Sequence, residues 1–368
     1  MAIHTIQLVS KPLKKQQFRH CMDRAFELIQ KSCYRIAHKD CCILAVQPSG
    51  IHGIKIVINN AKLPPLYDST IPHLSLTFNP SLLLGGGYDD LCDITPSNFE
   101  FCAAFIDNIL DELETGLTCD KLILSRIDCT LDVDFPCETD LMYYIMGIKR
   151  TALPAYYKQL AFGPKFENYK ERNRHSFRAA CQDVTLTVYD KSFQLLEQEL
   201  MAESEVPSNR LRFEVAIQNQ AFQRLLNKYG PEYHLCTCYD RLDKKIIWFS
   251  KMSVHLVRDY FKQTLTPGEF LSGRLAVRKI VASDYSDKTK RRMVDFLCAV
   301  GRYHKNGIAG AIRAFKEQGY SQDQVIYLLR CFQKIDLNPV TVNVNSGFDR
   351  FPSISELLAE NALPASIP

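Results

Sequence analysis

The chain has 368 residues, of which 46% are hydrophobic and 23% are charged, and its net charge is +4. This length is sufficient for two domains, and the composition is that of an ordinary globular protein. No stretch approaches the roughly 20 continuous apolar residues of a membrane helix, and the start lacks the basic and apolar runs of a secretory signal. These features disfavour a membrane-spanning or secreted protein, and the expectation is a cytoplasmic one.

The chain has 14 cysteines, which could suggest a disulfide framework. Most of them lie inside apolar runs, as at Cys102, Cys129 and Cys298, where a free thiol behaves as a small hydrophobic residue. The tightest cluster is His234-x-Cys236-x-Cys238, and it lacks the second pair of ligands that zinc sites show. The cysteines therefore agree with a reducing compartment.

Strand and helix patterns alternate over the first 220 residues. Period-two alternation of apolar and polar residues predicts strands, and apolar residues at helical spacing predict helices. The expected strands are residues 3–9, 51–58, 73–78, 122–134, 184–189 and 210–217. The expected helices are residues 16–32, 95–113, 139–149 and 191–202.

Helical patterns dominate the sequence after residue 220, and a proline-rich tail follows them. The expected helices are residues 221–228, 251–264, 288–299, 307–318 and 321–332. The sequence therefore predicts an α+β domain over residues 1–220, with an antiparallel sheet covered by helices on one face. A mainly helical domain over residues 221–335 and a loosely structured tail over residues 336–368 complete the prediction.

Three of the expected strands combine an apolar face with a face of reactive side chains. Because residues two apart share a face of a strand, Arg126 lies with Asp128, and Arg212 lies with Glu214. By the same rule, Tyr189 shares a face with Thr187 and Lys191. Arginines and acids two residues apart are also typical of cross-strand ion pairs, so the pattern by itself leaves both interpretations open.

Breaking a phosphodiester bond requires a nucleophile, positive charge at the phosphate and assistance to the leaving oxygen. The phenol of Tyr189 can attack and leave reversibly, which suits an enzyme that later rejoins strand ends. Asp128 and Glu214 are hard oxygen ligands suited to Mg²⁺ or Mn²⁺. Lys191 is expected to lower the pKa of the tyrosine or to stabilise the transition state.

The order of these motifs resembles the filamentous-phage replication initiators, the gene II and gene X protein family. That family carries an Arg-Ile-Asp motif, a Tyr-x-Lys motif and an Arg-Phe-Glu motif in this order, and the tyrosine is its nicking nucleophile. The matching stretches are Arg126-Ile127-Asp128, Tyr189-Asp190-Lys191 and Arg212-Phe213-Glu214. The resemblance implies the palm-type sheet of HUH nucleases, with Tyr189 as nucleophile and Lys191 and Arg212 as further catalytic residues.

Two weaker stretches extend the resemblance over about residues 70 to 335. Residues 79–86 are similar to the family's Pro-x-x-x-Leu-x-Gly segment, and residues 301–303 and 318–320 are similar to its C-terminal helical region. One departure concerns the metal. The wider superfamily carries a His-hydrophobe-His motif, whereas this chain has His73-Leu74-Ser75. His73 is therefore the expected third ligand beside Asp128 and Glu214.

The resemblance implies an initiator of rolling-circle DNA replication that acts in the cytoplasm of a bacterial host. It would nick one strand of a double-stranded circular origin, keep the 5′ phosphate on Tyr189 and later rejoin the displaced single strand. A host helicase and polymerase are the implied partners. A basic segment that alternates with aromatic residues precedes the tyrosine and is expected to contact DNA. Its cations are Lys165, Lys170, Arg172, Arg174 and Arg178.

Other functions remain open at this point. A plasmid or transposon initiator, or a conjugative relaxase, would use the same chemistry in another genetic context. A phage-encoded regulator could use the sheet to bind DNA without cutting it. A metabolic enzyme is disfavoured because the sequence has no phosphate-binding loop, no dinucleotide fingerprint and no catalytic serine or cysteine motif.

Overall fold

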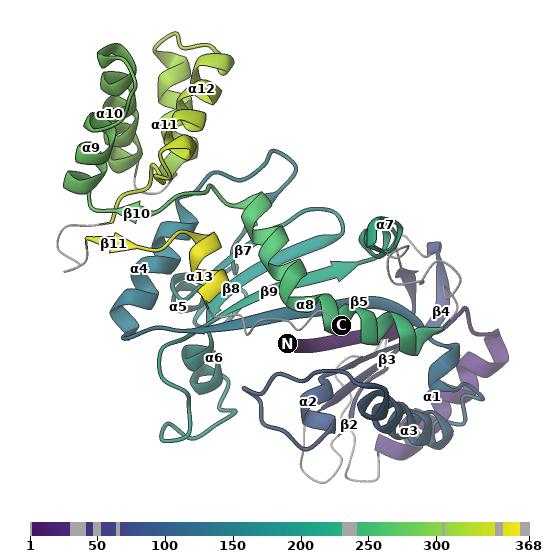
Figure 1. Cartoon of the computed structure of the whole chain (residues 1–368). Helices are drawn as coiled ribbons and strands as arrows, with labels where there is room; N and C mark the ends of the chain where they lie inside the picture. The colour runs from purple at the N-terminus through teal and green to yellow at the C-terminus, as the bar shows by residue number, and fades with distance from the viewer. Residues whose placement is uncertain are drawn as a thin grey trace. The chain divides into compact units, whose positions relative to one another are not determined.

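Figure 1 shows the chain as a computed structural model. The residues that it describes are 2–29, 42–46, 53–63, 67–229, 241–303, 306–342 and 349–360. The cluster of His234, Cys236 and Cys238 lies outside these residues.

The central feature is a sheet of nine strands with the order β2-β3-β4-β1-β5-β9-β8-β7-β6. β1 pairs antiparallel with both β4 and β5, as β3 does with β2 and β4. The expectation of an α+β fold with an antiparallel sheet is confirmed at this level. The strands are β1 (Ala2–Val9), β2 (Cys42–Val46), β3 (Ile54–Leu63), β4 (Tyr67–Phe78), β5 (Ile123–Asp134), β6 (Lys158–Leu160), β7 (Ser176–Ala180), β8 (Val184–Asp190) and β9 (Arg210–Gln218).

Helices fill the connections between strands and most of the chain after β9. The helices up to β9 are α1 (Lys15–Ile29), α2 (Pro80–Leu83), α3 (Pro96–Glu112), α4 (Glu138–Lys149), α5 (Tyr169–Arg174) and α6 (Lys191–Glu197). Those after β9 are α7 (Gln220–Tyr229), α8 (Leu242–Thr264), α9 (Gly273–Val281), α10 (Asp287–Arg302), α11 (Gly307–Glu317), α12 (Gln322–Lys334) and α13 (Ile354–Glu360). Among the described helices, none combines the length and the apolar character needed to cross a bilayer.

The chain divides into two compact units, and each unit is built from separate stretches. Unit 1 contains residues 1–131, 182–185 and 214–256, and unit 2 contains residues 132–181, 186–213 and 257–368. The sequence predicts a single break near residue 220. The structure differs because β5, β8, β9 and α8 each contribute residues to both units. Local patterning does not reveal such an exchange, since each of these elements is continuous in sequence.

In unit 1, the sheet has one apolar face and one polar face. Ile54, Ile56 and Ile58 of β3 are buried, whereas the alternate residue Lys55 is exposed. Helix α1 contacts β2, β3 and β4, and its residues Cys21, Ala25 and Leu28 are buried. On the polar face, Gln7 of β1 donates to the hydroxyl of Ser75 in β4 at 2.8 Å. The alternation read from the sequence therefore separates the core from the reactive side chains.

A bulge in β1 changes which residues share the polar face. Ile3 lies opposite Cys129 of β5, but Thr5 lies opposite Asp128, so β1 carries one extra residue at His4. A β-bulge re-aims the side chains beside it. Ile3 is fully buried, whereas His4 and Thr5 are both partly exposed. The bulge brings the side chain of His4 to the face that also carries Asp128.

In unit 2, the residues that the sequence assigns to a loose tail are partly packed. Arg350–Phe351 form β11, which pairs with β10 (Phe270–Leu271), and α13 follows. Leu337, Val340, Phe351 and Leu358 are each buried to 94% or more. These apolar side chains are covered by residues distant in sequence. The proline content of the segment therefore does not predict its structure, because apolar residues between the prolines are buried by tertiary packing.

Candidate functional site

The carboxylate of Asp128 lies on the polar face of unit 1 and is held by a neighbouring arginine. Arg126 Nε donates to Oδ1 at 2.6 Å, and Arg126 Nη2 donates to Oδ2 at 2.7 Å. The Asp128 side chain is only 3% exposed, whereas that of Arg126 is 39% exposed. Such a bidentate pair is geometrically specific and strong. The two side chains lie on one strand face, as the sequence predicts.

Glu214 of β9 lies beside His4, a residue that the sequence did not single out. His4 Nδ1 is 3.6 Å from Glu214 Oε1, and Thr5 Oγ1 is 3.0 Å from the same nitrogen. Both side chains are partly exposed, at 21% for His4 and 14% for Glu214. The electrostatic influence of Glu214 reaches Asp128 and raises its pKa. His4, Asp128 and Glu214 therefore share the polar face of unit 1, although among the described residues only Glu269, Asp336 and Glu356 bring three possible ligand atoms within 4.8 Å of one another.

The geometry of this cluster fits a divalent cation in part. Two ligand atoms that bind one cation at about 2.1 Å each can lie up to about 4 Å apart, so the 3.6 Å between His4 and Glu214 is suitable. Each oxygen of Asp128 accepts one hydrogen bond from Arg126 and has a second lone pair that a cation could use. Only the distance between His4 and Glu214 is within the range for two ligands of one cation, so these two residues are the better-placed ligands.

Burial raises the pKa of Asp128 to about 6, which is opposed by the hydrogen bonds and charge of Arg126 and reinforced by Glu214. The unfolded carboxyl titrates near 3.9. A raised pKa means that the folded state holds this proton more tightly. Asp128 therefore contributes its full stabilisation below about pH 4, and this contribution is lost as the pH rises through about 6.

We expect Asp128→Asn to change the pH dependence of stability in a defined direction. The measured quantity is the stability difference, defined as the free energy of unfolding of the parent chain minus that of the variant. This difference should decrease by on the order of 2 kcal/mol from pH 4 to pH 7. Urea titrations at several pH values measure this difference. A difference that stays constant over the range would show that Asp128 keeps an ordinary pKa.

The structure does not bring His73 to these acids. β1 pairs with β4 so that Val9 lies opposite Ser75, which places His73 two residues beyond the end of β1. Asp128 lies opposite Thr5, so His73 is about six strand positions away, or roughly 20 Å. His73 is 3% exposed and its Nδ1–H donates to the Ile71 carbonyl at 3.0 Å. This arrangement suits a structural histidine in a buried strand.

Tyr189 and Lys191 lie in unit 2, at the junction of β8 and α6. Tyr189 is in β8 and is 8% exposed. The strand ends at Asp190, and Lys191 is the first residue of α6, so Lys191 does not continue the strand face as the sequence predicts. Its Nζ donates to Gln194 Oε1 at 2.9 Å. The reason is local: Asp190 accepts from the Phe193 amide at 3.0 Å and caps the helix.

A buried histidine–aspartate pair next to Tyr189 in the sequence was not predicted. His175 Nδ1 donates to Asp190 Oδ2 at 3.0 Å, and the imidazole stacks on Phe193 with ring centroids 4.0 Å apart. Both residues line a cavity of about 290 Å³ in unit 2, together with Glu138 and Glu203. The pair fixes the start of α6, which positions the residues on either side of Asp190. No spacing signal marks it, because residues 175 and 190 lie on separate elements.

Arg212, predicted to be catalytic, is buried in an ion pair within unit 2. Its side chain is fully buried, and its Nε and Nη2 donate to the two oxygens of Asp132 at 2.7 Å each. Two residues away, Arg210 donates to Asp134 at 2.9 Å, but the Asp134 side chain is 67% exposed. The alternative of cross-strand ion pairs therefore describes Arg212 and Arg210 directly.

These two ion pairs offer a matched comparison of stability. Asp132→Ala should lower the free energy of unfolding by about 3 kcal/mol, because it leaves a buried guanidinium without its carboxylate partner. Asp134→Ala should cost less than about 1 kcal/mol, because its carboxylate is already in solvent. Urea unfolding of both variants measures the contrast. Equal small losses would show that Arg212 is not held by Asp132.

The predicted DNA-binding cations of unit 2 differ in how far their side chains are exposed to solvent. Lys165, Lys170 and Arg174 are exposed, whereas Arg172 is half-buried and paired with Glu197 at 2.7 Å. The guanidinium groups of Arg172 and Arg178 lie 5.8 and 5.4 Å from the centre of the Phe162 ring. The alternation of cations and aromatic residues therefore partly reflects cation–π packing.

A second acidic cluster in unit 2 has cations among it. Oxygens of Glu269, Asp336 and Glu356 lie within 4.8 Å of one another. Lys279 contacts Glu269 at 2.8 Å, and Arg350 contacts Glu269 at 2.6 Å and Glu356 at 3.6 Å. These ion pairs with Lys279 and Arg350 account for the clustering of the three carboxylates.

His4 is the functional candidate that sequence reasoning missed. Its signal in the sequence is weak: one histidine in the alternating strand 3–9, on the face that strict alternation assigns opposite to Thr5. Only the bulge shows that it shares the face of Asp128. Comparisons with known proteins add no assignment, because no family model matches the chain and no curated protein resembles it significantly.

Proposed function

We propose that the protein initiates rolling-circle DNA replication as a metal-dependent endonuclease that nicks one strand through a 5′-phosphotyrosine. The observation that supports this most is the bulge in β1, which sets His4 beside Glu214 on the face that carries Asp128. A polar face with two carboxylates and one imidazole is suited to hold Mn²⁺ or Mg²⁺. In this proposal the sheet is of the HUH palm type, and the mainly helical region after β9 is a second functional part.

Each residue has a defined role in the proposed reaction. His4 and Glu214 would hold the cation, with Asp128 as a further carboxylate on the same face. Such a cation would supply positive charge for a DNA phosphate bound at this face of unit 1. Tyr189 Oη loses its proton and attacks phosphorus, the bond from phosphorus to O3′ breaks, and the departing O3′ takes up a proton. The 3′ hydroxyl primes synthesis, and attack by a later 3′ hydroxyl on the phosphotyrosine releases Tyr189 and joins the strand.

The structure modifies the roles that the sequence implied. Lys191 is the first residue of α6, and the hydrogen bond from its Nζ to Gln194 Oε1 helps to hold the β8–α6 junction. Arg212 is assigned to the ion pair with Asp132 rather than to the reaction. Lys165, Lys170 and Arg174 remain the exposed cations proposed to contact single-stranded DNA near the tyrosine.

The deciding experiment is covalent capture. The protein is mixed with supercoiled DNA of its own replicon and Mn²⁺ or Mg²⁺, denatured, and analysed by peptide mass spectrometry. A nucleotide adduct on the peptide that contains Tyr189 is the expected result. An adduct on another tyrosine would keep the reaction class and remove Tyr189 from it. Nicked DNA without any adduct would assign the attack to water.

One observation favours a second candidate, a DNA-binding regulator without nuclease activity. Arg126 occupies both oxygens of Asp128 and thus already neutralises the carboxylate. A regulator would bind its DNA equally well with and without divalent cations and would leave supercoiled DNA intact. The same capture experiment therefore separates the two candidates.

A further inference from the structure

The positive charge of the chain is concentrated in helices α9 to α12. Residues 273–334 contain 13 lysines and arginines against 5 aspartates and glutamates, a net charge of +8. The whole chain carries +4, so the remaining residues sum to −4. A strongly basic segment within a chain that is otherwise acidic is the electrostatic footprint of a polyanion-binding surface.

Helices α10, α11 and α12 pack around an aromatic core. The ring of Phe296 in α10 lies 5.1 Å from that of Phe315 in α11 and 5.9 Å from that of Phe332 in α12. Val325 and Leu328 of α12 are also buried. The three helices contact one another pairwise, and together they form a three-helix arrangement within unit 2.

The connection between α11 and α12 has the form of a helix-turn-helix. α11 ends at Glu317 and α12 begins at Gln322, which leaves a turn of four residues. Gly319 in this turn has φ +90°, a conformation that favours glycine. Ser321 then starts α12 with a capping box to Gln324. A turn of three or four residues with glycine is the connection typical of helix-turn-helix motifs.

The outer face of α12 carries side chains that can read DNA. Asp323, Tyr327, Arg330 and Lys334 recur at helical spacing and are exposed, whereas Val325 and Leu328 point into the core. In such motifs the residues at the start of the second helix contact base edges, and here these are Asp323 and Gln324, both exposed. Arg330 and Lys334 lie in the second half of α12, where Arg330 matches the acceptors of guanine and Lys334 matches phosphate.

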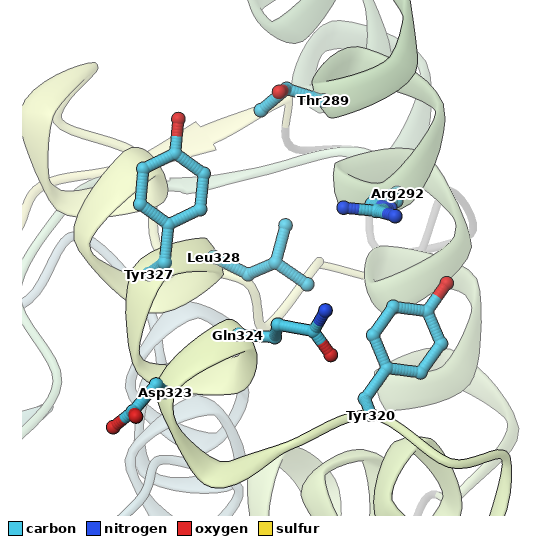
Figure 2. A pocket seen from close by; sticks show the side chains of 7 residues that line it. All are labelled: Thr289, Arg292, Tyr320, Asp323, Gln324, Tyr327 and Leu328. Atoms are coloured by element: carbon cyan, nitrogen blue, oxygen red, sulfur yellow. The ribbon is translucent and has the colours of Figure 1, made fainter.

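A groove between α10 and α12 joins this face to the basic start of α10. Its cavity of about 220 Å³ is lined by Thr289 and Arg292 of α10, and by Tyr320 and Tyr327 from the turn and α12, among others. Figure 2 shows these side chains facing one another across the groove. The Arg292 guanidinium lies 5.6 Å from the centre of the Tyr320 ring. This ring is therefore already stacked on a cation.

We propose that α10 to α12 form a reader of double-stranded DNA, with α12 in the major groove and the start of α10 on the phosphates. The shape of an exposed helix favours duplex over single-stranded DNA, because the major groove admits a helix. Arg292 lies over the ring of Tyr320, whereas Tyr327 in the same groove is 52% exposed, so single strands are included as competitors in the test. The inference does not rest on the nicking activity, although it gives a nicking enzyme a means to find its origin.

The test measures binding of the full chain to a random-sequence duplex of about 30 base pairs, roughly three helical turns, in EDTA so that no cleavage intervenes. Lys288→Gln combined with Arg291→Gln removes two exposed cations of α10. We expect about tenfold weaker binding and a salt dependence reduced by about two counterions. The matched control, Lys14→Gln with Lys121→Gln, removes the same charge from exposed sites in unit 1 and should change binding little.

A second arm tests the reading face by selecting preferred sequences from a random duplex pool. The parent chain should enrich one sequence, and Tyr327→Ala with Arg330→Gln should reduce this enrichment while keeping the weaker general affinity. Equal loss in the α10 variant and in its control would overturn the proposal. Single strands that compete as well as duplex would overturn it too and assign the groove to single-stranded DNA. Because the assays contain no metal, these outcomes are independent of covalent capture.

Discussion

Tyr189→Phe is expected to abolish the covalent protein–DNA adduct and to slow nicking by at least about 1000-fold, because it removes the only oxygen of the proposed nucleophile. The phenylalanine ring keeps the buried volume of Tyr189, which is 8% exposed, so the fold should be retained. Denaturing gel electrophoresis of the protein with labelled supercoiled DNA measures the adduct. Duplex binding in EDTA should be unchanged.

The control for this variant is Tyr144→Phe in the same unit. Tyr144 is also buried, at 1% exposed, and its hydroxyl donates to the Pro352 carbonyl at 3.3 Å. Removing that hydroxyl should lower stability by about 1 kcal/mol and leave the adduct intact. An adduct that persists in Tyr189→Phe would show that Tyr189 is not the nucleophile. An adduct that disappears in both variants would show that the loss is not specific to Tyr189.

His4→Gln is expected to weaken Mn²⁺ binding by about 100-fold, and His73→Gln is expected to leave it unchanged. His4 Nδ1 lies 3.6 Å from Glu214, whereas His73 belongs to a distant part of the strand register. Removing a residue that hydrogen-bonds to a metal ligand lowers metal affinity by about 10- to 100-fold. Removing a ligand itself should lower the affinity by at least as much. Electron paramagnetic resonance of free Mn²⁺ measures the affinity without any requirement for activity.

The two histidine variants form a matched pair, since both exchange an imidazole in a β-strand of unit 1 for an amide. If both affinities stay at the parent value, His4 and Glu214 are only an ion pair and the metal proposal fails. If His73→Gln alone weakens binding, the original expectation from the sequence is right and the strand register has been misjudged. Glu214→Gln provides an independent check, because it should behave like His4→Gln.

Local pattern predicts much of the fold because alternation and helical spacing report burial directly. The strand expected at residues 122–134 is β5, Ile123–Asp134, and Arg126 and Asp128 share its polar face as expected. The helices expected at 307–318 and 321–332 are α11 and α12 to within two residues at each end. In each case the apolar residues that define the pattern are the ones that pack into the core.

Features that depend on distant partners were beyond the sequence. The proline-rich tail packs as β11 and α13 because Phe351 and Leu358 find cover elsewhere in unit 2. Arg212 was expected to act in catalysis, but only the tertiary structure shows Asp132 opposite it. Lys191 does not lie on the strand face because Asp190 caps a helix that begins at Lys191. The alternation of apolar and polar residues does not show that a helix cap replaces the strand at this point.

The sequence by itself determined that Arg126 and Asp128 share one strand face, which strands carry Asp128 and Tyr189, and which segments after residue 300 are helical. The tertiary structure alone decided that His4, not His73, lies beside Glu214. The physical reason is that a single inserted residue in β1 turns the side chain of His4 to the polar face, and strand register depends on hydrogen bonds between segments more than 100 residues apart.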